Sequence, residues 1–171
     1  MEKESFKKEI SILKEEDSIT GNKEELEYLS ETKLINNKYP FWGEIKILKS
    51  FIKTPSFINR ELDECGYILE DSYETWYYLN CEIEVSKTEY VFKKLNFTTS
   101  NYTLKYGEIV FSKDYSLSDF KNDFPISFIK NKTKEVNKVM ITVLSHELTD
   151  DSYIFTFKNR KLVELYYFFP C

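Results

Sequence analysis

The single histidine of the chain lies between a serine and a glutamate, in the order Ser145-His146-Glu147. These are the residue types of a nucleophilic triad, in which one ring nitrogen of histidine must reach the nucleophile and the other must reach the acid. Adjacent residues of a strand point to opposite faces, so three consecutive residues cannot build this arrangement. We therefore interpret His146 as a structural or exposed residue. A lone imidazole also argues against most zinc and iron sites, which use several.

A cluster of acidic and aromatic residues offers a second kind of chemistry. Its members are Glu70, Asp71, Glu74, Trp76, Tyr77, Tyr78, Glu82 and Glu84. We predict that this cluster binds a protein partner, because aromatic side chains bury much area at small entropic cost and carboxylates steer a basic partner. Alternatively, two of the carboxylates could form the acid pair of a hydrolase acting on a polar, carbohydrate-like substrate. Trp76 taken alone is expected in the core.

The remaining reactive residues do not form a cofactor or metal motif. The four glycines are isolated, and neither a GxGxxG nor a Walker pattern is present. Cys65, Cys81 and Cys171 are odd in number and widely spaced, which is atypical of a disulfide framework or a zinc site. A basic run over 130–138 has no interleaved aromatic residues, and we interpret it as a solvated loop. We therefore expect no cofactor, no metal and no catalytic residues.

The composition and net charge of the chain argue against some classes of binding partner. The chain has 171 residues with a net charge of -5, which argues against binding to nucleic acid or to an anionic membrane. The first ten residues lack the apolar region of a signal peptide, and the sequence contains no apolar run long enough for a membrane helix. We therefore expect a cytoplasmic protein with a protein partner. A structural accessory protein is a further alternative, and the oligomeric state stays open.

The elements that must position the acidic and aromatic cluster are mainly strands. The chain contains no alanine, the strongest helix former, whereas Phe, Tyr, Ile and Val are abundant. Residues 1–38 are charged and helical in pattern, which predicts an N-terminal helical appendage. From residue 41 onward, the motif Trp42-Gly43-Glu44-Ile45 recurs as Tyr106-Gly107-Glu108-Ile109. This match predicts two tandem units within one compact domain, over 41–100 and 101–171.

Each unit is expected to consist of a short strand, a helix and an antiparallel meander. In the first unit, Thr54 and Pro55 resemble a helix start, which predicts a helix over 54–66. In the second unit, Ser116 and Asp119 resemble a capping box, and Pro125 is expected to end the helix.

The meander strands are predicted over 75–79, 82–86 and 89–97 in the first unit, and over 138–144, 153–157 and 162–169 in the second. The last two are joined by a tight turn at Asn159. The fold class is therefore α+β, a mainly antiparallel sheet with a few short helices on one face. The opposite face would stay free to meet a partner.

The second unit resembles a recurring α+β repeat of β-lactamase-inhibitor-like proteins and small outer-membrane-assembly lipoproteins. The residues that carry the resemblance are Gly107–Phe111, the 116–124 helix and the strand pair over 153–166, with an Asn turn followed by Lys-Leu-Val-x-Leu. Small bacterial toxin-immunity proteins share this appearance. The resemblance implies inhibition of a partner by a sheet face and its loops, and it carries over no catalytic residues. It departs from the pattern at Arg160, where the turn often has glycine, and in lacking a lipobox cysteine. We therefore expect an immunity or inhibitor protein that neutralises a cognate toxin.

Overall fold

A computed structural model describes residues 27–30, 32–51, 54–60, 68–69 and 74–170. Most of the predicted N-terminal helical appendage lies outside these residues. At its end, the expectation of helix is wrong, because Lys33–Ile35 forms strand β1. Tyr28 forms an isolated bridge with Leu144 instead of continuing a helix.

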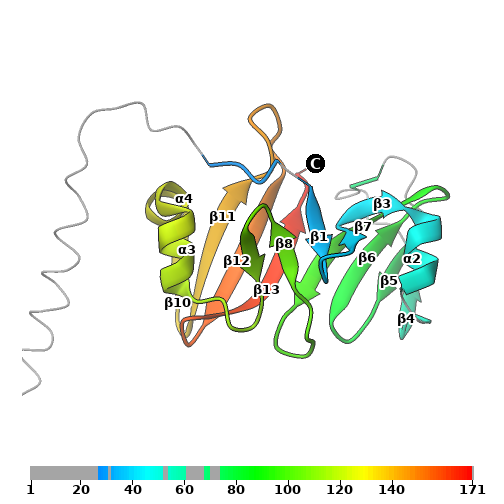
Figure 1. The fold of residues 1–171 in the computed structure, drawn as a ribbon, viewed down its shortest axis with the longest axis horizontal. Coiled ribbons are helices and arrows are strands. Elements are labelled where there is room, and N and C mark those ends of the chain that lie inside the picture. Colours follow the sequence, from blue (N-terminus) through cyan, green and yellow to red (C-terminus); the bar gives the residue numbers. More distant parts are fainter. Residues whose placement is uncertain (1–26, 31, 52–53, 61–67, 70–73, 171) are drawn as a thin grey trace, which may run out of the picture.

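The main element of the fold is a nine-stranded sheet in which all pairs are antiparallel, as the sequence predicted (Figure 1). Its strands, in spatial order, are β10 (Lys132–Glu135), β11 (Lys138–Leu144), β12 (Ser152–Lys158), β13 (Lys161–Phe168), β7 (Glu89–Asn96), β6 (Cys81–Val85), β5 (Glu74–Tyr77) and β4 (Phe57–Asn59). The short strand β3 (Trp42–Glu44) pairs with β7 beside this order. The predicted meander strands are therefore confirmed.

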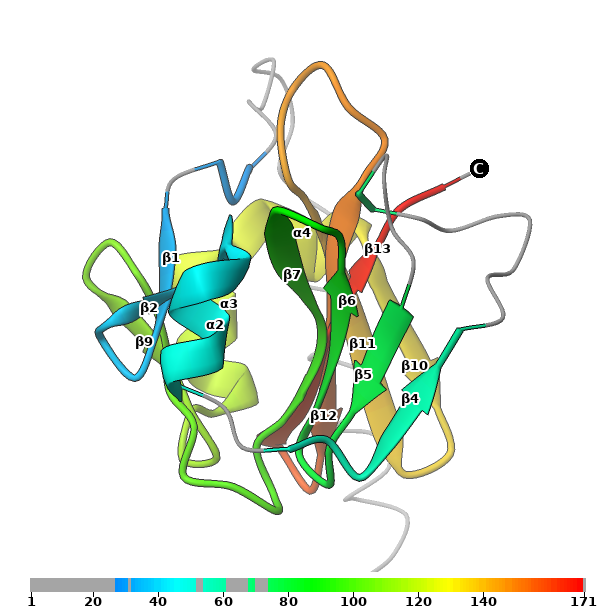
Figure 2. The ribbon, with the colours of Figure 1, turned by 90° about the vertical axis from the view of Figure 1, so that its right-hand side faces the viewer.

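A smaller sheet and three short helices form a second layer. The small sheet has the order β2 (Tyr39–Pro40), β1, β8 (Leu104–Tyr106) and β9 (Ile109–Phe111). The helices are α2 (Ile45–Phe51), α3 (Leu117–Asp123) and α4 (Pro125–Lys130). In Figure 2 this layer lies on one side of the large sheet, which confirms the α+β class. None of the helices in the described part of the chain has the length and apolar character needed to cross a lipid bilayer.

Aromatic side chains fill the space between the two layers. Phe120 of α3 is fully buried, with its ring 5.1 Å from that of Phe155 and 5.5 Å from that of Phe157 on β12. Phe111 of β9 belongs to the same group, and its ring centre lies 4.9 Å from that of Phe155. Such tilted and edge-on pairs are the favoured packing of aromatic rings. The abundant phenylalanine of the sequence is therefore used to join the layers.

The helix predicted over 54–66 is wrong for its first part. Phe57–Asn59 forms the edge strand β4 and pairs with β5, while residues 61–67 lie outside the described part of the chain. The ring of Phe57 lies 5.6 Å from that of Tyr77, so a cross-strand aromatic contact stabilises the extended form. The actual helix, α2, begins earlier, at Ile45.

The structure does not confirm the tandem repeat. Gly43 lies within strand β3, whereas Gly107 has a φ of 54° and lies between β8 and β9. The two matching segments therefore have different conformations.

The helix predicted after Ser116 is confirmed together with its capping box. The hydroxyl of Ser116 accepts from the backbone N–H of Asp119 at 3.1 Å, and the Asp119 carboxylate accepts from the Ser116 backbone N–H at 2.8 Å. The helix ends at Asp123, and Pro125 begins the next helix, α4. The Glu27 carboxylate accepts from two backbone N–H groups at the start of α4, at 2.8 and 3.1 Å.

Candidate functional site

The face of the large sheet that points away from the helices carries a continuous row of side chains. Residues that pair directly on neighbouring strands share a face, so the register places them side by side. From β4 to β11, this cross-strand row consists of Phe57, Tyr77, Glu82, Lys94, Tyr166, Ile154 and Thr142. It crosses seven strands and brings together residues from both halves of the chain.

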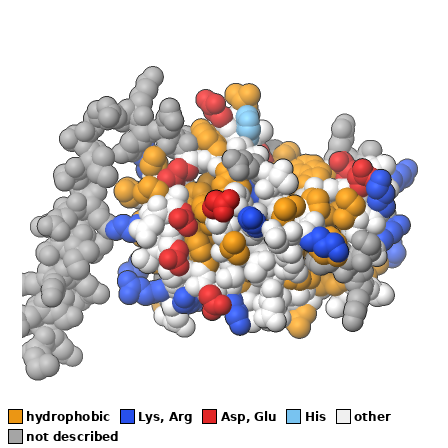
Figure 3. Space-filling model, in the orientation of Figure 1, with side chains coloured by type: hydrophobic (Ala, Val, Ile, Leu, Met, Phe, Trp, Pro, Cys, Tyr) orange, Lys and Arg blue, Asp and Glu red, His pale blue; other side chains and the backbone are white. Residues whose placement is uncertain are grey.

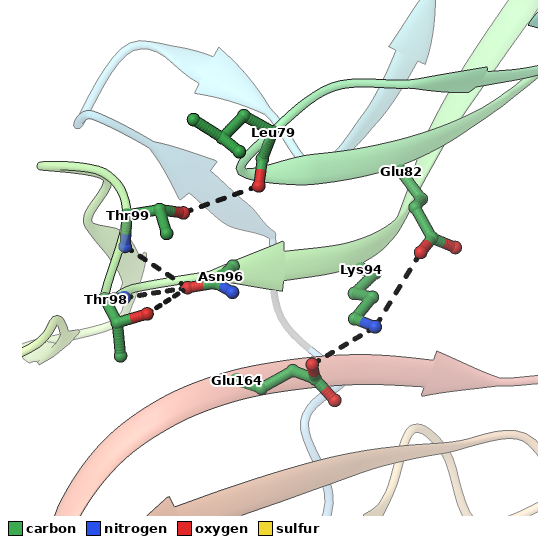
Figure 4. A network of polar contacts seen from close by, with 7 residues as sticks. All are labelled: Leu79, Glu82, Lys94, Asn96, Thr98, Thr99 and Glu164. Atoms are coloured by element: carbon green, nitrogen blue, oxygen red, sulfur yellow. Dashed lines mark hydrogen bonds and ion pairs between the residues drawn. The ribbon is translucent and has the colours of Figure 1, made fainter. Parts of the chain in front are cut away.

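Lys94 lies at the centre of the cross-strand row between two carboxylates. Its Nζ atom is 3.2 Å from Glu164 and 3.7 Å from Glu82. Figure 4 shows the Lys94 side chain directed between these two carboxylates. Partial burial acts to lower the pKa of Lys94, but hydrogen bonding and charge from Glu164 and Glu82 raise it above its ordinary value. The lysine is therefore charged, and the group carries one net negative charge that is spread over three strands.

The aromatic residues of the row flank this charged centre. Phe57 is 61% exposed at the edge of the sheet, and its ring contacts that of Tyr77. Tyr166 pairs with Lys94 on the other side. Burial first, and then the charge of Glu82, raises the pKa of Tyr166, so its hydroxyl stays protonated and can donate a hydrogen bond.

We call the face of the large sheet that points away from the helices the open face. A network of hydrogen bonds around Asn96 lies at one border of it. The side-chain oxygen of Asn96 accepts from the Thr98 backbone and hydroxyl at 2.9 and 2.7 Å and from the Thr99 backbone at 3.3 Å. The Thr99 hydroxyl donates to the carbonyl of Leu79 in the turn between β5 and β6, 3.5 Å away (Figure 4). A hollow of about 260 Å³ lies beside Glu164 and Asn96, and Lys138 and Lys158 also line it.

The structure brings only part of the predicted cluster together. Tyr77 and Glu82 are paired in the cross-strand row. Glu84 is on the same strand as Glu82 but is only 1% exposed, and its carboxylate accepts from the backbone N–H groups of Ile68 and Leu69 at 2.7 and 2.8 Å. Glu84 therefore holds a loop in place and is not available to a partner.

Glu74 and Trp76 of β5 are oriented toward the opposite face from Tyr77. The Trp76 indole N–H donates to Glu74 at 2.6 Å, and Arg60 donates to the same carboxylate at 3.0 Å. Trp76 packs against the core, as expected for that residue alone. Tyr78 also packs against the core, and burial raises its pKa.

Glu70 and Asp71 lie outside the described residues. The eight predicted residues therefore do not form one surface among those that the structure describes.

Several exposed acids lie where the sequence interpretation did not place them. Figure 3 shows acidic side chains in the region where Figure 1 places α3 and β8. Exposed acids of this part of the chain are Glu108, Asp114, Asp119 and Asp123. Exposed lysines, among them Lys113 and Lys121, lie in the same part of the chain.

Sequence reasoning missed Phe57, Lys94, Glu164 and Tyr166. Lys94 and Glu164 are seventy residues apart, and only the pairing of β7 with β13 makes them neighbours. Alternation along 162–168 could have assigned Glu164 and Tyr166 to the face opposite Leu165, but it could not name the neighbouring strand. Phe57 was missed because its segment was assigned to a helix.

The other reactive side chains are engaged within the fold. The Ser145 hydroxyl donates to Asp151, whereas His146 Nδ1 accepts from the Leu148 backbone at 3.2 Å, so the two residues interact with different partners. Burial raises the pKa of the Cys81 thiol to about 12, which leaves it protonated near neutrality. The described residues contain no group of three or more His, Cys, Asp or Glu side chains placed to hold a metal ion.

Neither a protein-family model, nor a curated protein, nor a solved structure matches the chain.

Proposed function

We propose that this protein is a non-catalytic binding module that inhibits a protein partner, in the manner of an immunity protein neutralising a bacterial toxin. The observation that carries the proposal is the cross-strand row, which combines flanking aromatic side chains with a central Glu82–Lys94–Glu164 group. Aromatic anchors supply buried area in an interface, and a fixed charge pattern selects the partner and its register.

The partner in this proposal has a basic surface. The chain carries a net charge of -5, although its described residues hold 18 Lys or Arg and 15 Asp or Glu. Within the described part, attraction of a basic partner would come from the Glu82–Lys94–Glu164 group, which contributes one net negative charge. Complementary charge raises the rate of association and makes it sensitive to salt. As an immunity protein, the chain would act in the cytoplasm of the cell that makes the toxin.

The described carboxylates favour binding over hydrolysis. Glu74 is occupied by Trp76 and Arg60, Glu82 by Lys94, and Glu84 by two backbone N–H groups. A glycosidase needs two carboxyls facing one substrate bond. The hydrolase alternative gains no support from these contacts, and a purely structural accessory role stays the other alternative.

The proposal is tested by co-expressing the chain in a bacterial host with its candidate toxin, the protein encoded by the gene adjacent to its own, which we call the product of the neighbouring gene. We expect that product alone to arrest growth and the wild-type chain to restore it. The purified pair should form a complex, and the variant F57A/Y77A should weaken it about tenfold or more, because it removes two aromatic anchors.

The matched control is V110A/I129A, which trims two side chains of similar exposure, 46% and 47%, on β9 and α4. We expect this variant to bind within about threefold of the wild type, as is typical of residues outside an interface centre. Absence of any complex with the neighbouring product would contradict the proposed function. Equal losses in the two variants would contradict the assignment of the open face.

A further inference from the structure

The loop between β11 and β12 carries a strongly exposed apolar side chain at its tip. This 145–151 loop runs from Ser145 to Asp151 and projects beyond the large sheet, as the orange segment at the top of Figure 1. Leu148 is 85% exposed. Single exposed apolar residues are common on protein surfaces, so Leu148 alone carries no argument. Hydrogen bonds at the base and the tip of the loop, however, hold this side chain in place.

Both ends of the loop are fixed to each other and to the core. The Ser145 backbone N–H donates to the Asp151 carbonyl at 2.9 Å, and the Ser145 hydroxyl donates to the Asp151 carboxylate. Asp151 is buried and also accepts from the hydroxyl of Tyr167 on β13. The Tyr167 ring stacks on Tyr153 at 4.7 Å, and the buried Lys33 ammonium lies 4.8 Å from the Tyr153 ring centre. The base of the loop is therefore part of the packed interior.

The tip has its own hydrogen bonds. The Leu148 backbone N–H donates to His146 Nδ1 at 3.2 Å, and the Thr149 backbone N–H donates to the His146 carbonyl at 3.4 Å. The hydroxyls of Ser145 and Thr149 lie 3.3 Å apart across the loop. A segment ordered before binding loses less conformational entropy when it meets a partner. These contacts set the position of Leu148 in the free protein.

Charge and position indicate what the tip would meet. Glu147 and Asp150 are exposed and flank Leu148, so the apolar side chain has an acidic surround. At the base of the loop, Ser152 pairs with Phe168, which is 41% exposed and, by strand alternation, on the same face as Tyr166. The loop is thus continuous with the open face, and its chemistry complements an apolar pocket with a basic rim.

We propose that Leu148 is an anchor residue of the interface, inserted by the rigid 145–151 loop into an apolar pocket on the basic partner. This inference rests on the proposed function and names the segment and the partner chemistry. Glu147 and Asp150 steer the approach, and Asp151 holds the loop in its binding form. His146 acts here as a turn residue that accepts a backbone hydrogen bond.

The test uses the purified product of the neighbouring gene as the probe and L148S as the main variant. We expect the dissociation constant to rise about tenfold or more, because truncating an anchor removes its buried contacts. The matched control is V136S, since Val136 is 90% exposed in the turn between β10 and β11. V136S should bind within about threefold of the wild type. The double variant E147Q/D150N should lower the association rate and its dependence on salt.

The order of the loop is measured without a partner. Backbone amide exchange at Leu148 and Thr149 should be slower than in an unstructured peptide, and S145A should accelerate it. If these amides of the wild type exchanged as fast as those of an unstructured peptide, the statement that the loop is rigid would be overturned. Binding that persists in L148S but is lost in F57A/Y77A would overturn the Leu148 anchor while supporting the proposed function. Failure of the wild-type chain to bind the probe would overturn the proposed function and the anchor with it.

Discussion

Among individual residues, Asp151 and Glu84 are the acidic side chains that the described part of the protein buries. Each accepts hydrogen bonds from more than one donor, and these bonds offset the cost of burying a polar group. Their roles differ: Glu84 holds residues 68–69 against the sheet, whereas Asp151 joins a surface loop to the core. The most exposed acids lie elsewhere in the described part of the chain. The buried acids therefore stabilise the fold, and in the proposed function the exposed acids attract the partner.

Acid should weaken the protein partly through Asp151. Burial acts to raise the pKa of Asp151, but hydrogen bonds from Ser145, Thr149 and Tyr167 lower it below its ordinary value. A group whose pKa is lower in the folded state contributes stability above its unfolded pKa of about 3.9, and this contribution is lost as the pH falls through the folded pKa. We expect D151N to lower the free energy of unfolding by about 1 to 3 kcal/mol near neutrality and by less at pH 3.

Urea denaturation at a series of pH values measures this difference. Y167F and S145A provide the comparison, because each removes one donor and keeps the carboxylate. Both should raise the pKa of Asp151 toward its ordinary value and start the acid loss of stability at a higher pH. Parallel pH profiles for wild type and D151N would show that Asp151 is not a source of the acid sensitivity.

Among the elements, the hairpin of β12 and β13 has the most demanding turn. Asn159 and Arg160 have φ values of 49° and 62°, the pattern of a two-residue type I′ turn. Asparagine tolerates this region because its short polar side chain can hydrogen-bond locally, whereas the steric cost of the arginine Cβ is not offset in this way. We expect R160G to stabilise the protein by up to about 1 kcal/mol, offset in part by the greater freedom of glycine in the unfolded chain.

Thermal and urea unfolding of R160G and R160A measure the effect. R160A removes the charge and length of the side chain but keeps the Cβ, so it should show no comparable gain. The Arg160 carbonyl accepts from the Leu117 backbone N–H in every variant, which keeps the contact with α3 constant. An equal gain in R160A would mean that the arginine side chain, rather than its backbone conformation, limits stability.

Elements with strong local signals could be predicted from the sequence. The Ser116–Asp119 capping box and the turn at Asn159 depend on neighbouring residues, and both are confirmed. The helix predicted over 54–66 is wrong in its described first part, where the start signal of Thr54-Pro55 is outweighed by pairing of Phe57 with Tyr77 on β5. Tertiary contacts of this kind override local propensity.

In the candidate site, too, contacts between residues far apart in the sequence could not be predicted. Glu82 and Tyr77 were identified because they lie within one stretch of alternating strands, and the register confirms that they are neighbours. Lys94 and Glu164 were not identified from the sequence, because their contact depends on the pairing of β13 with β7 across the middle of the sheet. Alternation assigns a side chain to a face, but it does not specify which strand lies alongside.

At the scale of the whole molecule, strand pairing joins the two halves of the chain that were predicted to meet near residue 100. Strand β7 of the first half pairs with β13 of the second, and in the small sheet β1 pairs with β8. Glu27 adds a further link by capping α4. Because β7 pairs with β13 and β1 pairs with β8, each half loses these joining pairs when the other half unfolds.

We therefore expect one cooperative unfolding transition, and the two tryptophans allow a direct test. Trp42 and Trp76 both lie in the first half, so their fluorescence reports on that half alone. V143A on β11 trims a fully buried side chain of the second half and should cost about 2 kcal/mol. V85A on β6 makes the same change in the first half, where Val85 is equally buried.

In both variants the tryptophan fluorescence and far-ultraviolet circular dichroism midpoints in urea should shift together, since a single transition senses destabilisation anywhere. If V143A shifted the circular dichroism transition but left tryptophan fluorescence at the wild-type midpoint, the halves would be independent. The cross-strand row would then lie across two separately unfolding units, and partner binding would stabilise each of them by a different amount. A shared transition instead means that a partner bound to Phe57 and Tyr77 raises the free energy of global unfolding of both halves together.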